Sequence, residues 1–217
     1  RRIVDAYNAY FDTDAIDAAG LAPAQPYIDQ IQGADTLAEL ATLWGTPGYP
    51  SPLGGGVGVD SKEPTRYSIF FGSGGLGLPD RDYYLTDNPK FVEARQKYVT
   101  HIAAMLKLAG QPDPAGAAQR IYDLEKQIAQ VHWTRAEQRQ VEKIYNPMAT
   151  ADLAAKMPGF DWNAMLTQQR LAGQPQVIVA QPSALTGTAK LIQATPISTW
   201  KEYLAYHTIS NAAPLLS

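Results

Sequence analysis

The sequence contains no cysteine among its 217 residues. Without thiols the chain cannot form disulfides, act through a cysteine nucleophile or hold zinc through cysteine ligands. Charged residues are also scarce at 18%, and the formal net charge is −3, with no block of Lys or Arg. The sequence therefore lacks the electrostatic signature of nucleic-acid-binding proteins, and we expect no nucleic-acid partner.

Long hydrophobic runs are missing as well. No stretch of about 18 apolar residues occurs, so we expect no membrane span in this segment. Apolar residues still make up 45% of the chain, which is enough for a sizeable core. The chain starts at Arg1 rather than Met and stops at Ser217 after an apolar, helix-like stretch. We therefore expect residues 1–217 to be one region of a longer polypeptide, cut at both ends.

Recognisable catalytic patterns are absent too. His101, His132 and His207 are far apart in sequence, whereas a His-Glu-x-x-His zinc motif places two imidazoles on one helix face. We predict that each histidine lies on a helix surface or at an interface. No Gly-x-Ser-x-Gly elbow occurs, and the glycine-rich run 72–77 lacks the ending of a phosphate loop, so it is predicted to be a turn. The sequence thus offers no catalytic and no metal-binding residue.

Apolar residues recur at helical spacing through most of the chain. The pattern predicts helices at 3–10, 13–20, 26–31, 37–44, 89–109, 114–131, 134–145, 150–157 and 161–173, with two more beginning at Pro182 and Pro196. The capping box Thr134-x-x-Glu137 marks the start of one of them. Helices therefore dominate the predicted fold.

Residues alternate in β-fashion in only a few places. Val57–Val59 and Tyr67–Phe71 flank a polar turn and are typical of a hairpin, and Val177–Ala180 is a short strand that could join it. The Gly- and Pro-rich stretch 45–58 is predicted to be loop. The fold class is therefore mainly α: a multi-helix domain with a small β-hairpin or sheet.

A cluster of carboxylates surrounds Arg81. Asp80, Asp82 and Asp87 could form a pair for acid–base chemistry or an ion-paired turn, and we favour the turn because structural networks also cluster charges. We expect Arg81 to anchor this turn through hydrogen bonds to Asp80, Asp82 or nearby carbonyl groups.

One segment around this cluster resembles a known family. Residues 75–85, Gly-Leu-Gly-Leu-Pro-Asp-Arg-Asp-Tyr-Tyr-Leu, resemble the Gly-Leu-Gly-Leu-Pro-x-Arg-Asp-Tyr-Tyr signature of the neprilysin and endothelin-converting-enzyme family. We expect a structural role for the signature residues Gly75, Leu76, Gly77, Leu78, Pro79, Arg81, Asp82, Tyr83 and Tyr84. Further segments resemble the family in the same order, namely Asp14–Asp17, Leu124-Glu125, Tyr145–Met148, Asp161-Trp162, Val177–Val179 and Trp200–Leu204.

The resemblance implies a role for the whole region. In that family a helical domain faces a thermolysin-like catalytic domain, and the two enclose a chamber that admits peptides. The zinc ligands lie in the C-terminal half, in His-Glu-x-x-His and a downstream Glu-x-x-x-Asp. By resemblance, residues 1–217 are the N-terminal lid-type region of a two-domain zinc metallopeptidase that hydrolyses oligopeptides. The implied partners are the C-terminal catalytic half and the substrates, and the implied zinc belongs to the parent protein, with none bound by this segment.

One alternative remains open at this point. The segment could instead be a non-catalytic helical module that binds peptides or proteins. Asn8-Ala9-Tyr10-Phe11 is similar to the family's substrate-binding strand, but it lies in a helical pattern, and we interpret it as chance similarity.

Animal relatives carry cysteines that this chain lacks, which fits a bacterial member. The resemblance also favours a periplasmic, secreted or membrane-anchored location.

The surface of a lid-type region should differ from that of an independent domain. We expect the terminal helices, at Arg1–Tyr10 and Ile197–Ile209, to carry apolar side chains that the catalytic half covers. Uncovered, they would form a patch larger than the few hundred Å² usual for monomers, so the isolated region should self-associate or fray there.

Overall fold

The computed structural model describes residues 2–215. Arg1 and Leu216–Ser217, at the two ends of the predicted region, lie outside the described residues. The α-helices are α1 (Arg2–Phe11), α2 (Thr13–Ala19), α3 (Gln25–Gln32), α4 (Leu37–Gly45), α5 (Asp82–Leu85), α6 (Pro89–Leu108), α7 (Pro114–Val131), α8 (Arg135–Gln138), α9 (Leu153–Lys156), α10 (Trp162–Gln168), α11 (Pro182–Ala194) and α12 (Ile197–Ala212). The strands are β1 (Leu53–Val59), β2 (Tyr67–Ser73), β3 (Asn146–Ala149) and β4 (Gln176–Val179), and two short 3-10 turns are η1 (Thr150–Asp152) and η2 (Ala213–Leu215).

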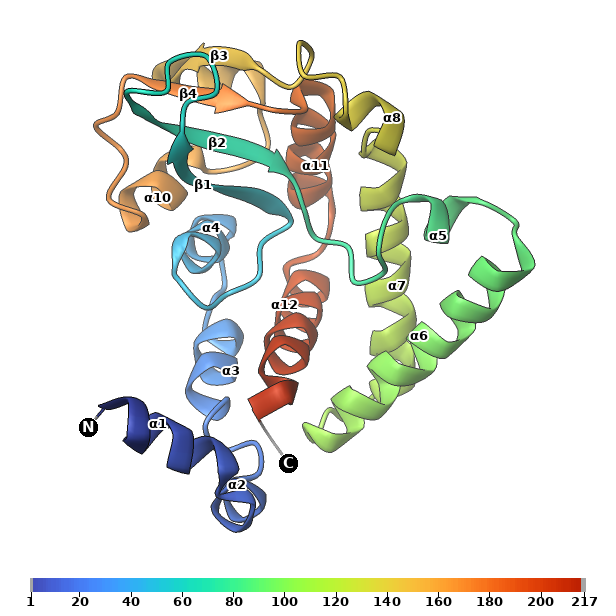
Figure 1. Ribbon diagram of the computed structural model, residues 1–217. Coiled ribbons are helices and arrows are strands. Elements are labelled where there is room, and N and C mark those ends of the chain that lie inside the picture. The colour runs from blue at the N-terminus through green and yellow to red at the C-terminus, as the bar shows by residue number, and fades with distance from the viewer. Residues whose placement is uncertain (1, 216–217) are drawn as a thin grey trace.

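The four strands form one sheet in the order β1-β2-β4-β3. β1 and β2 are the predicted hairpin, and β4 joins β2 in parallel while β3 pairs with β4 antiparallel. Helices α4 and α10 lie on one side of this sheet, and α11 and α12 follow one another through the middle of the molecule (Figure 1). The mainly α fold with a small sheet is therefore confirmed.

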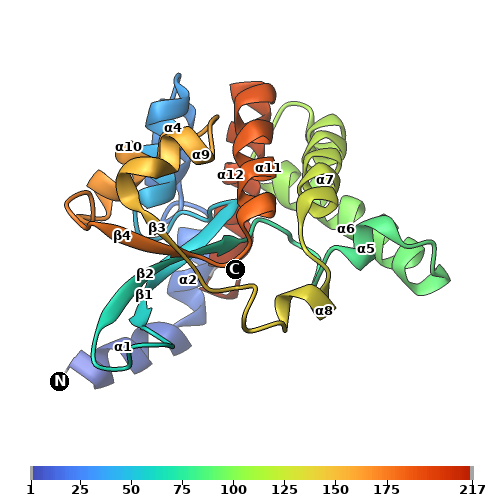
Figure 2. The same ribbon diagram turned by 90° about the horizontal axis from the view of Figure 1, so that it is seen from above.

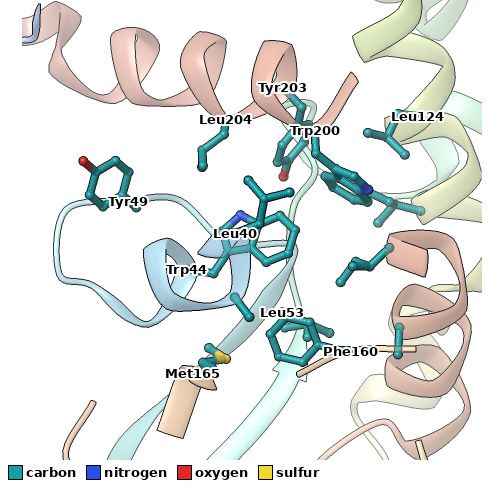
Figure 3. Packing of buried hydrophobic residues seen from close by; sticks show 14 of the residues in the cluster. Leu40, Trp44, Tyr49, Leu53, Leu124, Phe160, Met165, Trp200, Tyr203 and Leu204 are labelled. Carbon is teal, nitrogen blue, oxygen red and sulfur yellow. The ribbon is translucent and has the colours of Figure 1, made fainter. Parts of the chain in front are cut away.

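The core lies where α4, α12 and the sheet meet. Trp44 of α4 packs edge-on against Trp200 of α12 with ring centroids 5.3 Å apart, and Trp200 packs likewise against Tyr203. Figure 3 shows these rings with Leu53 of β1 and Phe160 filling the space between the helix and the sheet. All five side chains are buried. Burial of such large aromatic surfaces supplies most of the driving force for docking the helices on the sheet.

Two predictions about local structure are wrong. The helix predicted over 134–145 ends at Gln138, and turns lead from there to β3, which begins at Asn146. Residues 135–144 have too few apolar side chains at helical spacing to bury a helix face, so pairing with β4 determines their path instead. The stretch 45–58, predicted as loop, contains most of β1. Gly55 lies against Phe71, where an added Cβ would come within 2.8 Å of the ring.

The two terminal helices differ from each other. α1 is exposed along its length, and five of its large side chains, Ile3, Val4, Tyr7, Tyr10 and Phe11, have relative exposures between 58% and 86%. α12, which was also expected to be uncovered, is instead a central helix of the core, with Trp200, Tyr203, Leu204, Tyr206 and Ile209 buried. The apolar side chains of α1 are therefore exposed, as expected, whereas the expectation of an uncovered α12 is wrong. Apolar residues lie on all sides of α12, and a helix that is apolar on all sides is a buried one.

α6 and α7 pack against each other and against α12, and their buried residues belong to the same hydrophobic core. Seen from above, they lie on the far side of α12 from α4 and α10, and the segment from β2 to α5 crosses to reach them (Figure 2). That crossing segment is the signature turn, residues 74–81, which leads into α5. The fold thus brings the signature into contact with α6, α7 and α12 at once.

Candidate functional site: a buried glutamate beneath the signature turn

The signature turn begins with glycines that no other residue could replace without movement. Gly75 has φ +85°, and a Cβ there would lie 2.7 Å from the Cα of Pro52. The hydroxyl of Tyr203 donates to the Gly75 carbonyl at 3.0 Å. The turn is therefore held directly against α12.

Gly77 makes the closest approach. Its N–H donates to Glu125 Oε2 at 3.2 Å, and a Cβ at this position would lie 1.8 Å from the hydroxyl oxygen of Tyr98. The residue after it, Leu78, donates its N–H to the hydroxyl of Tyr84 at 2.9 Å. The spacing Gly77-Leu78 therefore places two backbone donors over a buried polar cluster.

Glu125 of α7 is the centre of that cluster, and its exposure is 0%. Tyr84 donates its hydroxyl to Oε2, and Tyr98 donates to Oε1 at 2.8 Å. His207 Nε2 lies 2.7 Å from Oε1. Together with the Gly77 amide, these groups give the carboxylate partners from the turn, α5, α6 and α12. We call Glu125, Tyr84, Tyr98, His207 and the Gly77 amide the Glu125 cluster.

The tyrosines of the cluster act as permanent donors. Burial, followed by the negative charge of Glu125, raises the pKa of Tyr84 and of Tyr98 far above the usual value for a phenol. Because Glu125 is fully enclosed, no substrate can reach its carboxylate. The cluster can therefore hold elements in place but cannot perform acid–base chemistry on a bound molecule.

The other signature residues surround this centre. Leu76 and Leu78 pack against the core, and the ring of Tyr83 packs on Phe91 with centroids 4.4 Å apart. Pro79 and Asp82 are exposed, and Asp82 is the first residue of α5. The side chains of the signature thus divide into those that contact the core and those that only shape the turn.

Sequence reasoning missed three members of the cluster, Glu125, Tyr98 and His207. One signal could have indicated Glu125, because it lies four residues after Ile121 and three before Ile128 on the apolar face of α7. A carboxylate on a buried helix face requires hydrogen-bond donors. Nothing in the spacing of the sequence indicates which tyrosines or which histidine would supply them.

The predicted anchoring role of Arg81 is wrong in its partners. Asp80 forms an ion pair with Arg135 of α8 and accepts the N–H of Asp82, and within residues 2–215 neither Asp80 nor Asp82 bonds to Arg81. The Nε of Arg81 is buried without a hydrogen-bond partner in that range. The cation that holds the segment is Arg95 of α6.

Arg95 reaches back from α6 to the end of α5. It donates to the carbonyl of Tyr84 at 3.0 Å and to that of Thr86 at 2.8 Å, and its side chain is 15% exposed. We expect Arg95→Ala to lower the free energy of unfolding by about 2 kcal/mol, because two charge-assisted bonds are lost. Arg81→Ala, its matched control, should cost less than about 1 kcal/mol. Urea unfolding of both variants measures this, and a larger loss for Arg81 would restore the original assignment.

The three histidines differ in their surroundings. His101 is exposed on α6, as predicted, whereas His207 belongs to the Glu125 cluster and His132, at the end of α7, is 8% exposed. The helix-surface interpretation is therefore wrong for the buried His132, whereas His207 lies at the interface of α12 and α7, which is the other alternative. No group of three or more His, Asp or Glu side chains among residues 2–215 lies close enough together to hold a metal ion.

His132 should make stability depend on pH. Burial lowers its pKa to about 4, opposed by a hydrogen bond to the Gly74 backbone and aided by the charge of Arg81. The unfolded chain therefore binds a proton near pH 6.5, at which the folded chain does not, and stability falls as the pH drops from 6.5 toward 4. Between pH 7 and pH 5 we expect a loss of about 2 kcal/mol. Urea unfolding should show this loss for the unsubstituted protein but not for His132→Gln. Equal losses in the two proteins would contradict the role of His132.

Comparisons with known proteins agree with the signature. The model of peptidase family M13, for its N-terminal part, matches residues 1–217. Endothelin-converting enzyme 1 from Cavia porcellus is 25% identical over 188 residues, which cover 84% of this chain and 24% of the relative. The human enzyme gives the same values. The chain thus spans about a quarter of the length of these curated relatives.

Solved structures show the same fold. Zinc metalloprotease Zmp1 of Mycobacterium tuberculosis, in complex with an inhibitor, aligns with a TM-score of 0.89 and 31% identity over 97% of this chain and 33% of that chain. Its open state gives a TM-score of 0.91 and 30% identity, over 97% of this chain and 34% of that chain. PepO from Lactobacillus rhamnosis, at 16% identity and a TM-score of 0.78 over 97% of this chain and 34% of that chain, shares the fold.

The described helices differ from membrane-spanning helices. Within residues 2–215, none of the helices combines the length and the apolar character that crossing a bilayer requires.

Three observations indicate the same family: the signature around Gly77, the arrangement of helices and sheet, and the match over residues 1–217. The chain belongs to peptidase family M13, the neprilysin-like zinc metallopeptidases.

Proposed function

We propose that this chain is the helical wall of the substrate chamber in a zinc endopeptidase that hydrolyses oligopeptides. The observation that carries the proposal is the match of residues 1–217 to the N-terminal part of the family, at 31% identity to a zinc metalloprotease in complex with an inhibitor. The chain covers 33% of that structure, which leaves room for a catalytic half elsewhere in the polypeptide.

The zinc of the family does not fit the described residues. His132 is buried, His207 is partly buried in the Glu125 cluster, and residues 2–215 contain no cluster of ligands suitable for a metal ion. In the proposed arrangement, the C-terminal half would hold the zinc, which would supply Lewis-acid chemistry for peptide hydrolysis. This chain supplies shape, because its wall excludes folded proteins. A periplasmic, secreted or membrane-anchored location belongs to the same proposal.

The exposed apolar face of α1 supports the proposal that another part of the intact protein covers it. Tyr7 and Phe11 stack with ring centroids 4.6 Å apart on a helix without a buried residue. A helix of this length is marginal in water unless its apolar face is covered. We assign that face to contact with the catalytic half.

The test compares the intact protein with residues 1–217 alone. The intact protein should contain one zinc and cleave a quenched fluorescent decapeptide but not a folded protein. Residues 1–217 should bind no stoichiometric zinc, cleave nothing and self-associate in sedimentation experiments. Tight zinc or peptide cleavage by residues 1–217 would disprove the assignment. An intact protein that binds peptides without cleaving them would support the binding-module alternative.

A paired substitution tests the surface of α1. Tyr7→Ser with Phe11→Ser should lower peptide hydrolysis by the intact protein roughly tenfold at unchanged zinc content, because buried aromatic residues dominate interfaces. Leu108→Ser is the matched control, since Leu108 is 75% exposed at the end of α6. Equal activity of the two variants would show that α1 does not contact the catalytic half.

A further inference from the structure

One edge of the sheet is open. β1 is an outer strand, and the hydrogen bonds from Gly74 N–H to the Pro52 carbonyl (3.2 Å) and from Asp60 N–H to the Arg66 carbonyl (3.0 Å) fix its pairing with β2. Hydrogen-bonded pairs alternate along antiparallel strands, so the even-numbered residues of β1 bond to β2. The N–H and C=O groups of Gly55, Val57 and Val59 therefore point away from the sheet, and all three residues are exposed.

The opposite edge is protected in a way that β1 is not. In β3 the bond from Thr150 N–H to the Pro175 carbonyl (3.0 Å) continues the pairing, which leaves Pro147 facing outward without an N–H to donate. β1 has the sequence Leu-Gly-Gly-Gly-Val-Gly-Val, with no proline and no charge. Natural edge strands usually carry proline, lysine or a bulge that prevents pairing with another chain. The edge of β1 has none of these.

The hairpin that carries this edge is firmly held. Asp60 follows β1, is fully buried, and accepts hydrogen bonds from Arg66, Ser68 and Tyr145, the last at 2.9 Å from the segment before β3. Its carboxylate also accepts the N–H of Lys62, which closes the turn. An added strand would therefore meet a preformed edge, which lowers the entropic cost of binding.

A groove lies beside the same edge. It has a volume of about 680 Å³ and is lined by residues of β1, the loop 46–51 and the end of α10. A second hollow of about 350 Å³ continues past Leu171, which lines both, to Val57 and Tyr67. Backbone groups at an edge and a groove for alternate side chains are the two parts of a site for β-strand addition.

The groove carries a single charged side chain among the described residues that line it, Arg170. Arg170 has φ +61°, and it is the one residue in 2–215 other than glycine with positive φ. The bonds from Arg170 N–H to the Thr167 carbonyl and from Leu171 N–H to the Leu166 carbonyl form the helix-ending motif in which glycine is preferred. A strained arginine where glycine is favoured indicates a use for its side chain.

We propose that an extended oligopeptide with an acidic side chain adds to the edge of β1 as a fifth strand, and that Arg170 binds its carboxylate. The backbone bonds to Gly55, Val57 and Val59 give affinity for any sequence, while the cation selects the acidic residue. The inference rests on the proposed function for the source of the peptide, an oligopeptide substrate, but its test requires no turnover.

The test is hydrogen exchange on the intact protein with a capped hexapeptide of alternating threonine and valine that contains one aspartate. Excess peptide should slow exchange at Gly55, Val57 and Val59 and leave Gly54, Gly56 and Gly58 unchanged. N-methylation of alternate peptide residues should abolish protection in one register and preserve it in the other. Protection without this alternation overturns strand addition. Protection before peptide is added, whether constant or rising with protein concentration, overturns the peptide as occupant.

Arg170→Gly separates binding from folding. It should raise the thermal midpoint by roughly 2–4 °C, because the backbone strain is relieved. The same variant should weaken binding of the aspartate peptide roughly tenfold and leave binding of its asparagine analogue unchanged. Arg170→Lys should keep part of the preference for aspartate. An unchanged preference in Arg170→Gly overturns the role of Arg170. If zinc binding and cleavage are normal while the edge stays unprotected, this inference fails and the proposed function stands.

Discussion

Replacing Glu125 with alanine is expected to lower the free energy of unfolding by about 4 kcal/mol. The substitution removes the common partner of the Tyr84 and Tyr98 hydroxyls, whose bonds to Glu125 are buried, and of the Gly77 amide and the His207 ring, which are partly buried. The thermal midpoint should fall by roughly 8–16 °C. Urea and thermal unfolding of the purified variant measure both quantities.

Two further variants define the origin of this loss. Glu125→Gln keeps an acceptor oxygen and the volume, so it should cost less than the alanine variant. Glu202→Ala is the matched control, because Glu202 pairs with Arg120 at 2.7 Å on the surface. Surface ion pairs contribute about 0–1 kcal/mol. Similar losses at Glu125 and Glu202 would mean that the Glu125 cluster does not hold the turn.

Gly77→Ala is expected to cost about 3 kcal/mol, because the new Cβ would meet the hydroxyl of Tyr98 at 1.8 Å. Tyr98 cannot move aside cheaply, since its hydroxyl contacts both oxygens of Glu125 at 2.8 and 3.0 Å. Gly173→Ala is the control, because no atom lies within 4 Å of its added Cβ. It should change stability by less than about 0.5 kcal/mol.

The two substitutions should be coupled. In the background of Glu125→Ala, the ring of Tyr98 is released and can move, so Gly77→Ala should cost less than it does alone. A double-mutant cycle from urea unfolding gives this coupling energy, and residues in one network typically show about 0.5–3 kcal/mol. Strict additivity would show that the glycine is required by the turn itself and not by the Glu125 cluster.

The Glu125 cluster gives the family signature a structural role. Gly77 and the second tyrosine bond to a carboxylate that lies 41 residues after Tyr84 in the sequence. The signature is therefore one half of a contact whose other half is on α7. Arg81, the charged residue that draws attention in the sequence, has less to do with that contact than Arg95, which bonds to the carbonyls of Tyr84 and Thr86.

Local chemistry made much of the fold predictable from the sequence. Asn88 and Asp113 cap the helices that begin at Pro89 and Pro114, and Thr36 with Glu39 forms a capping box. These bonds join residues a few positions apart, so their energies depend little on the rest of the chain. The hairpin at 57–71 and the apolar strand at 177–180 were visible for the same reason, because their side-chain period is local.

Tertiary structure decided what local patterns left undetermined. Residues 139–149 leave the helical path because a polar helix there would bury little apolar surface, while residues 146–149 pair with β4. Gly55 is extended within β1, where the ring of Phe71 packs against it. Two similar apolar terminal helices became opposites, α12 in the core and α1 exposed. The sequence alone determined most of the helices, the hairpin and, by resemblance, the family. Burial of Glu125, the pairing of Asp80 with Arg135, and the open edge at Gly55 arise from contacts between distant segments, which no local spacing specifies.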